Sequence, residues 1–120
     1  MRSVGFDASE IGWSEEDQAL VSGLTDGDSY LTFQRVAECV SDAEDDGVHL
    51  EYSDQAHADY GCIGRCVVGR EELEIELTRD LGELEGVRRI VVRFEPSHRE
   101  QLLSGLRRIF RGTSALIEAM

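Results

Sequence analysis

Residues 49–64, HLEYSDQAHADYGCIG, hold the densest group of side chains that could do chemistry. The stretch contains two histidines, three carboxylates, two tyrosines and a cysteine. Imidazole, carboxylate and thiolate groups bind metals or act in catalysis, whereas carboxylates mixed with tyrosines are typical of protein interfaces. The candidate residues for partner binding are Glu51, Tyr52, Asp54, Gln55, His57, Asp59 and Tyr60.

The spacing of the possible ligands argues against a metal site. Cys62 and Cys66 lie four residues apart in an expected strand, where four residues span roughly 13 Å, so they cannot share a metal with bonds of about 2.3 Å. His49 and His57 flank a loop and could approach each other, but their spacing with the nearby carboxylates matches no zinc or iron pattern. We predict no metal and no cofactor.

Catalysis by a cysteine would need a thiolate beside a base. Cys62 and His57 are near each other in the sequence, but nothing else marks them as such a pair. Burial as small strand residues explains the three cysteines better. The chain has no glycine-rich phosphate loop, GxSxG motif or HExxH motif. We therefore predict no catalytic residues and expect the protein not to be an enzyme.

The length of 120 residues suits a single domain. Within it we expect an acidic N-terminal extension with a short strand or helix over residues 1–28, a core of sheet and helix over 29–112, and a tail over 113–120. No apolar stretch approaches the roughly 20 residues that span a membrane, and there is no signal-peptide pattern. Three cysteines make an odd number, which favours reduced thiols. These features predict a soluble protein of the cytoplasm. All 12 basic residues are arginine, and the chain has neither lysine nor asparagine, which indicates a GC-rich, bacterial genome.

The net charge of −13 comes entirely from one half of the chain. Residues 1–60 hold 15 Asp and Glu against two Arg, whereas residues 61–120 hold 10 of each. Such a field repels nucleic acid and anionic membranes, and it steers a cationic partner toward the protein. Acidity for solubility alone remains an alternative. The arginines near the C-terminus are explained by pairing with neighbouring glutamates, so we predict no nucleic-acid binding.

Alternating apolar residues predict five strands, over residues 30–40, 48–53, 62–69, 73–78 and 88–94. The turn-type cluster at 41–47 makes the first two a hairpin. A short strand at 3–6, a short helix or acidic loop at 14–22, and one helical turn within 79–86 are further possibilities. Glutamates and arginines on the outward faces of the fourth and fifth strands should pair across the sheet.

The clearest expected element is a C-terminal amphipathic helix. Ser97 and Glu100 fit a capping box, and Gly112 would end the helix. The apolar stripe comprises Leu102, Leu103, Leu106, Ile109 and Phe110. An amphipathic helix after an antiparallel sheet should lie on one face of that sheet. We predict an α+β fold with one mainly antiparallel sheet of about five strands, covered on one face by the helix.

The order of these features resembles the tenth family of immunity proteins from bacterial polymorphic toxin systems. The resemblance runs from about Tyr30 to Phe110, through the segments YLTFQR, VHLEYSDQ and CIGRCVVGREELEIEL. It is carried chiefly by Glu51, Asp54, Gln55, Tyr60, Gly61 and the ending LRRIF. It implies a small α+β protein without catalysis, made alongside a toxin by the same cell and neutralising that toxin by binding.

An acidic first half suits a basic toxin, and nuclease toxins are commonly basic because they hold phosphates. We therefore expect residues 42–60 to form an acidic, tyrosine-bearing inhibitory surface. A generic acidic protein-binding domain or DNA-mimic regulator is the alternative, and a metal or thiol enzyme is less favoured. The oligomeric state stays open, because the tail TSALIEAM could dock on the core or on a second copy.

Overall fold

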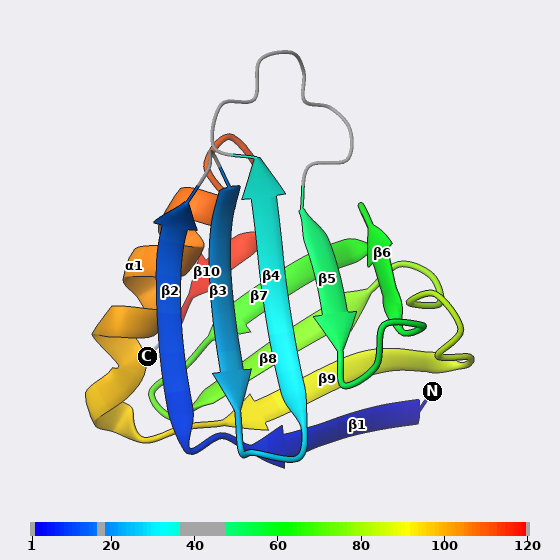
Figure 1. Ribbon diagram of the computed structural model, residues 1–120, viewed down its shortest axis with the longest axis horizontal. Helices are drawn as coiled ribbons and strands as arrows, with labels where there is room; N and C mark the ends of the chain where they lie inside the picture. The colour runs from blue at the N-terminus through cyan, green and yellow to red at the C-terminus, as the bar shows by residue number, and fades with distance from the viewer. Residues whose placement is uncertain (1, 17–18, 37–47, 120) are drawn as a thin grey trace.

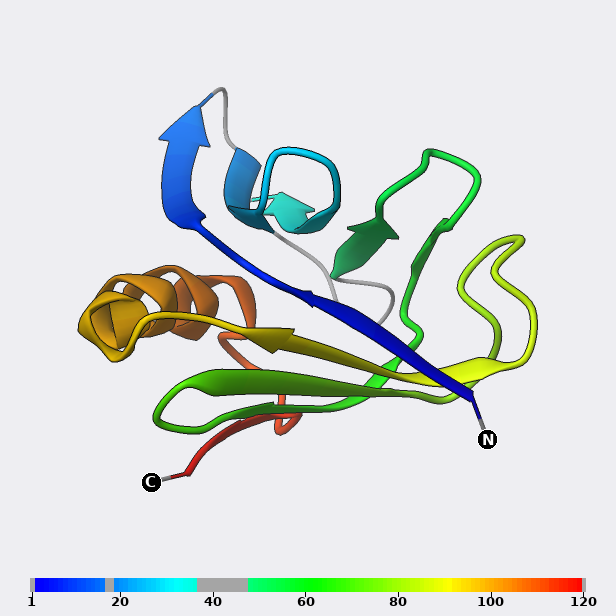
Figure 2. The same ribbon diagram turned by 90° about the horizontal axis from the view of Figure 1, so that it is seen from below.

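A computed structural model describes residues 2–16, 19–36 and 48–119 of the chain. Within them the chain forms two five-stranded sheets that face each other, with one α-helix (Figures 1 and 2). The strands are β1 (Arg2–Asp7), β2 (Glu10–Glu16), β3 (Ala19–Thr25), β4 (Tyr30–Val36), β5 (His49–Tyr52), β6 (Ala58–Tyr60), β7 (Ile63–Val68), β8 (Glu72–Leu77), β9 (Val87–Arg93) and β10 (Leu116–Glu118). The α+β class is confirmed, but one sheet of about five strands is wrong because there are two.

The antiparallel sheet has the strand order β2-β3-β4-β5-β6, so each strand pairs with the next along the chain. The predicted hairpin is confirmed as β4 and β5, in which Phe33 lies opposite Leu50. Alternation places Leu31 and Phe33 in the core and leaves Thr32 on the outward face. The expected turn at 41–47 and Cys39 lie outside the described residues.

The mixed sheet has the order β1-β9-β8-β7-β10. Its centre is the predicted set of three strands, with β8 antiparallel to both β7 and β9. The short strand expected at residues 3–6 is confirmed as part of β1, which runs parallel to β9. The tail supplies β10, which pairs in parallel with β7. The tail therefore docks on this chain's own sheet.

The first 25 residues contain more strand than the sequence suggested. The helix or acidic loop considered for residues 14–22 is wrong, because the described residues of this stretch belong to β2 and β3, which pair over seven positions from Glu10↔Thr25 to Glu16↔Ala19. Strand pairing satisfies backbone groups of both segments that a short helix would leave without partners at its ends. Tertiary packing also favours the strand, because Trp13 of β2 is half-buried against the helix at Gly105.

The helix α1 (Arg99–Ile109) lies along the inner side of β2 and β3, beside the gap between the sheets (Figure 2). All five residues of its predicted apolar stripe are buried. The capping box is wrong: a 3-10 turn, η1 (Pro96–His98), precedes the helix, and His98 is the N-cap without a side-chain hydrogen bond. Gly112 follows the helix with a φ of 86°, which a glycine adopts readily.

One hydrophobic core joins both sheets and the helix. Phe33 of the antiparallel sheet meets Phe110, which follows the helix, with 5.9 Å between ring centroids. Ile75 and Ile90 approach the same core from the mixed sheet and are fully buried. In the described part of the chain, no helix is both long and apolar enough to cross a membrane.

Candidate functional site

The predicted binding residues lie on the hairpin of β5 and β6, at one edge of the antiparallel sheet (Figure 1). Glu51 lies opposite Ala58, and His49 lies opposite Tyr60. These four positions share the outward face, since alternate residues of a strand point to the same side. Tyr60 is 56% exposed, although its ring packs edge-on against His49 with 4.8 Å between centroids.

The turn between β5 and β6 is fixed by its own hydrogen bonds. An oxygen of the Asp54 carboxylate accepts a bond from the Ala56 amide at 2.8 Å, and the His57 amide donates to the Asp54 carbonyl at 2.9 Å. Ser53 has a φ of 61°, and its amide donates to the Tyr30 carbonyl at 2.9 Å. These bonds hold the turn in one shape, and the side chains of Asp54 and Gln55 stay exposed.

The loop between β8 and β9 supports this hairpin from the side. The expected helical turn within residues 79–86 is wrong, because Leu81 and Leu84 form an isolated bridge. The Glu83 amide donates to the Ala56 carbonyl at 2.8 Å. Gly82 has a φ of 57°, and a Cβ there would lie 2.4 Å from the Ala56 oxygen. Only glycine allows the two loops to approach so closely.

Arg79, on the same loop, holds Asp59 in place. Its guanidinium lies 2.6 Å from the Asp59 carboxylate and also donates to the Tyr60 carbonyl. The hydrogen bond from Arg79 holds the pKa of Asp59 below its usual value. The outer edge of β6 is therefore occupied by this chain's own residues, and Asp59 is a paired carboxylate.

Tyr52 points inward, as its place in the alternation predicted. It is half-buried, and its ring lies 6.2 Å from that of Phe6 in β1. Burial raises the pKa of its hydroxyl. Tyr52 therefore anchors β5 to the other sheet, while its neighbour Glu51 faces outward.

Tyr30 belongs to this surface, although the sequence analysis did not single it out. Its hydroxyl donates a hydrogen bond to the carboxylate of Glu51. This bond raises the pKa of Tyr30 to about 12, because deprotonation would lose the bond and place two negative charges side by side. The signal in the sequence is the alternation of residues 30–36, which puts Tyr30 on the side of the strand opposite Leu31 and Phe33.

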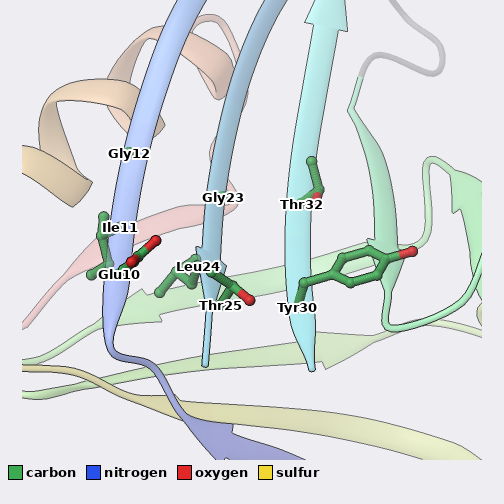
Figure 3. Close-up of a pocket in the computed structure, with 8 residues that line it drawn as sticks. All are labelled: Glu10, Ile11, Gly12, Gly23, Leu24, Thr25, Tyr30 and Thr32. Carbon is green, nitrogen blue, oxygen red and sulfur yellow. The ribbon is translucent and has the colours of Figure 1, made fainter. Parts of the chain in front are cut away.

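A hollow of about 330 Å³ lies on the outward face of β2, β3 and β4 (Figure 3). Its lining residues are Glu10, Ile11, Gly12, Gly23, Leu24, Thr25, Tyr30 and Thr32. Figure 3 shows the ring of Tyr30 extending from β4 toward β5. The hollow and the hairpin therefore meet at Tyr30.

The charge excess lies in the segment of the chain that contains the antiparallel sheet. Residues 10–60, which span β2 to β6, contain 14 Asp and Glu and a single arginine, Arg35. Arg35 is turned toward the helix end, where it donates to the carbonyls of Ile109 and Arg111 at 2.7 Å. The mixed sheet instead pairs its charges. The predicted pairing between the fourth and fifth strands is confirmed by Arg89 with Glu74, and Arg65 of β7 also pairs with Glu76.

A family model described as Immunity protein 10 matches residues 7–102 of this chain. The chain belongs to the Immunity protein 10 family. Membership in Immunity protein 10 implies a cognate toxin as the partner, as the resemblance suggested. No curated protein and no solved structure matches the chain.

The region matched by Immunity protein 10 covers the whole antiparallel sheet and strands β7 to β9. It includes every predicted binding residue and the hollow. The match therefore begins near Asp7, earlier than the resemblance that started at about Tyr30. The three strands formed by residues 2–25 explain why the N-terminal part belongs to the fold.

The two described cysteines are buried and unsuited to thiol chemistry. Burial raises the pKa of the Cys62 thiol and that of the Cys66 thiol, so the reactive thiolate is disfavoured. Among the described residues, no three His, Cys, Asp or Glu side chains are grouped so that they could hold a metal ion. The arrangement favours contact with a partner over chemistry.

Proposed function

We propose that this immunity protein neutralises its cognate toxin by direct binding through the β5–β6 hairpin. The observation that carries this proposal is the fixed geometry of the hairpin, whose polar side chains project from a turn held by backbone bonds and by the loop at Gly82. A surface fixed before binding loses less conformational entropy in the complex. The hairpin therefore has the rigidity that a tight inhibitor needs.

The proposed binding residues divide into two roles. Glu51, Asp54, Gln55, His57 and Tyr60 make the contact with the toxin. Tyr52 and Asp59 position the hairpin, since Tyr52 packs against Phe6 and Asp59 is bound by Arg79. The predicted surface over residues 42–60 includes residues 42–47, which lie outside the described part of the chain.

The toxin in this proposal is a basic protein of the nuclease type that acts in the cytoplasm. Residues 10–60 contain 14 carboxylates and a single arginine, so this segment of the chain attracts positive charge. Nucleases carry basic surfaces because they hold phosphates. Complementary charge would speed association and favour this partner over acidic proteins.

A triple substitution tests the contact. Glu51→Gln, Asp54→Asn and Asp59→Asn together should lower the association rate about tenfold at low salt and flatten its salt dependence. The rate is measured by surface plasmon resonance with the toxin immobilised. A second variant with only Glu51→Gln and Asp54→Asn spares the pair with Arg79 and should show most of the effect.

The matched control removes three carboxylates from the mixed sheet, through Glu72→Gln, Glu74→Gln and Glu76→Gln. It makes the same change in net charge and should leave the association rate close to that of the wild type. Unchanged affinity in the hairpin variant would refute the proposal. An equal loss in both variants would show that only net charge matters.

The charge excess by itself also suits a DNA-mimic or generic acidic regulator. Such a protein would bind several basic proteins and lose all of them at moderate salt. A pull-down from the native host at physiological and at high salt, followed by mass spectrometry, separates the two functions. A single toxin-like protein that survives high salt supports the immunity function.

A further inference from the structure

The outward face of the antiparallel sheet contains a row of five residues that crosses all five strands, and four of the five are small. Strand register places the row at Gly12, Gly23, Thr32, Glu51 and Ala58, each opposite the next. We call this row the glycine trough. It is bordered on one side by Glu10, Thr25 and Tyr30, and on the other by Ser14, Val21, Gln34, His49 and Tyr60.

The fold does not require glycine at the two glycine positions of the trough. A Cβ on Gly12 would meet nothing within 4 Å, and one on Gly23 would meet only the Leu31 oxygen at 3.8 Å. Neither residue has a positive φ. By contrast, a Cβ on Gly5 would lie 1.8 Å from the Val91 oxygen, and one on Gly105 would lie 2.7 Å from Trp13.

Glycine within a strand weakens the sheet and often marks a place where another chain or a ligand comes close. Gly12 and Gly23 lie opposite each other in adjacent strands and line the hollow of about 330 Å³. Among the described residues, none of the other elements covers this face in Figure 2. Two adjacent glycines that the fold does not need therefore point to an external partner on this face.

We propose that the glycine trough receives a protruding basic segment of the toxin. This inference rests on the proposed function and extends the contact from the hairpin across the sheet. Glu10 and Glu51 are the charged residues at described positions of the trough and its borders, and no arginine lies there. The charge on this face therefore complements arginine or lysine side chains.

The dimensions suit a single protein segment. Five strands spaced about 4.8 Å apart give a trough about 19 Å long, and on β2, β3 and β4 its two borders are four residues apart, or about 13 Å. A segment lying between these borders would reach the glycine backbone directly. Its basic side chains could then approach Glu10 on β2 and Glu51 on β5.

The test fills the trough without harming the fold. The toxin is identified as the protein that co-purifies with the chain, and it is then expressed and purified by itself. Its binding is compared among wild type, Gly23→Val and the double variant Gly12→Ala with Gly23→Ala. Gly23→Val should weaken binding about tenfold or more, and the double alanine variant by less. The melting temperatures of both should equal or exceed that of wild type, because glycine is the poorer strand residue.

Gly69→Ala is the matched control, since its Cβ would make an ordinary contact of 3.5 Å in the β7–β8 turn, away from the trough. It should leave affinity unchanged. If the melting temperature of Gly23→Val is below that of wild type, the variant Thr32→Arg is tested instead. It should weaken binding, because the new arginine would repel a basic segment of the toxin. Binding within about threefold of wild type for the folded trough variants would overturn the inference.

The hairpin variant separates the two proposals. If it loses binding while the trough variants bind as wild type does, the trough is wrong and the proposed function stands. If the wild-type chain retains no toxin, both proposals are wrong.

Discussion

The two sheets of this immunity protein contribute to one core but differ in how their outer faces carry charge. On the mixed sheet, the glutamates of β8 lie between arginines of β7 and β9, as in the pairs of Glu76 with Arg65 and of Glu74 with Arg89. The segment that contains the antiparallel sheet, residues 10–60, has almost the whole acidic excess and one arginine, Arg35, which donates hydrogen bonds to the end of the helix.

This difference teaches that the net charge of −13 comes from the segment of the chain that contains the antiparallel sheet. Charges paired across strands contribute to the stability of a sheet, whereas unbalanced charges create a field that a partner can sense. The mixed sheet therefore has the charge pattern of a stabilising element. The antiparallel sheet has the charge pattern of a recognition surface.

The glycines of the two sheets provide the largest expected contrast. Gly5→Ala should destabilise the protein by about 3 kcal/mol or more, because the new methyl group would overlap the Val91 oxygen between β1 and β9. Gly12→Ala should leave stability unchanged or raise it by about 0.5–1 kcal/mol. Urea unfolding followed by circular dichroism measures both. Equal losses in the two variants would show that Gly12 has a structural role after all.

Removing carboxylates should have a smaller effect that depends on the sheet. Glu74→Gln with Glu76→Gln should lower the free energy of unfolding by about 1 kcal/mol, because two cross-strand ion pairs are lost. Glu10→Gln with Glu51→Gln should cost less stability but slow toxin association. Chemical denaturation measures the free energy of unfolding, and stopped-flow binding measures the rate of association with the toxin. If the variant at Glu74 and Glu76 also associated more slowly with the toxin, the two sheets would not differ in their role in binding.

The smallest expected effect concerns the bond between Tyr30 and Glu51. Because this bond raises the pKa of Tyr30 from 10.0 to about 12 in the folded protein, its contribution is complete below pH 10 and is lost as the pH rises through about 12. Tyr30→Phe should therefore be less stable than wild type by roughly 0.5 kcal/mol at neutral pH, and the gap should close at high pH.

Unfolding free energies measured between pH 8 and about pH 12 test this dependence. Glu51→Gln serves as the control, since it removes the carboxylate that causes the shift, and Tyr30→Phe in that background should show no such dependence. A constant gap across the whole range would mean that the Tyr30 hydroxyl does not bond Glu51 in solution.

Much of the fold could be predicted from local patterns. The alternation of Leu73, Ile75 and Leu77 with glutamates predicted β8, and the apolar stripe from Leu102 to Phe110 predicted α1. Both patterns arise because one side of each element is buried, which leaves a period of two or of about 3.6 in the sequence.

Other elements could not be predicted from local patterns. The segment at Trp13 and Ser14 has the acidic residues of a helix start, yet it is a strand because β3 supplies its hydrogen bonds and Gly105 receives the indole ring. The capping box failed for a related reason, since Pro96 begins a 3-10 turn that moves the helix start to His98. Distant contacts overrode local preference in the first case.

The candidate site shows the same division. The types and spacing of Glu51, Asp54 and Tyr60 marked the hairpin, but the sequence contained no sign that Arg79 would bind Asp59 or that Gly82 would touch Ala56. The roles of Glu51, Asp54 and Tyr60 in binding the toxin stay predictions. The sequence did not indicate the glycines of the trough, because their position side by side depends on which strands are neighbours.

The sequence by itself determined the α+β class, most of the strands and the helix, because burial of one face imposes a period on the residues of each element. It also determined that the acidic excess belongs to the first half of the chain. Only the tertiary structure decided that ten strands divide into two sheets and that Gly12 lies opposite Gly23. Strand partners and the empty space above a residue depend on segments far apart in the chain, which no local pattern records.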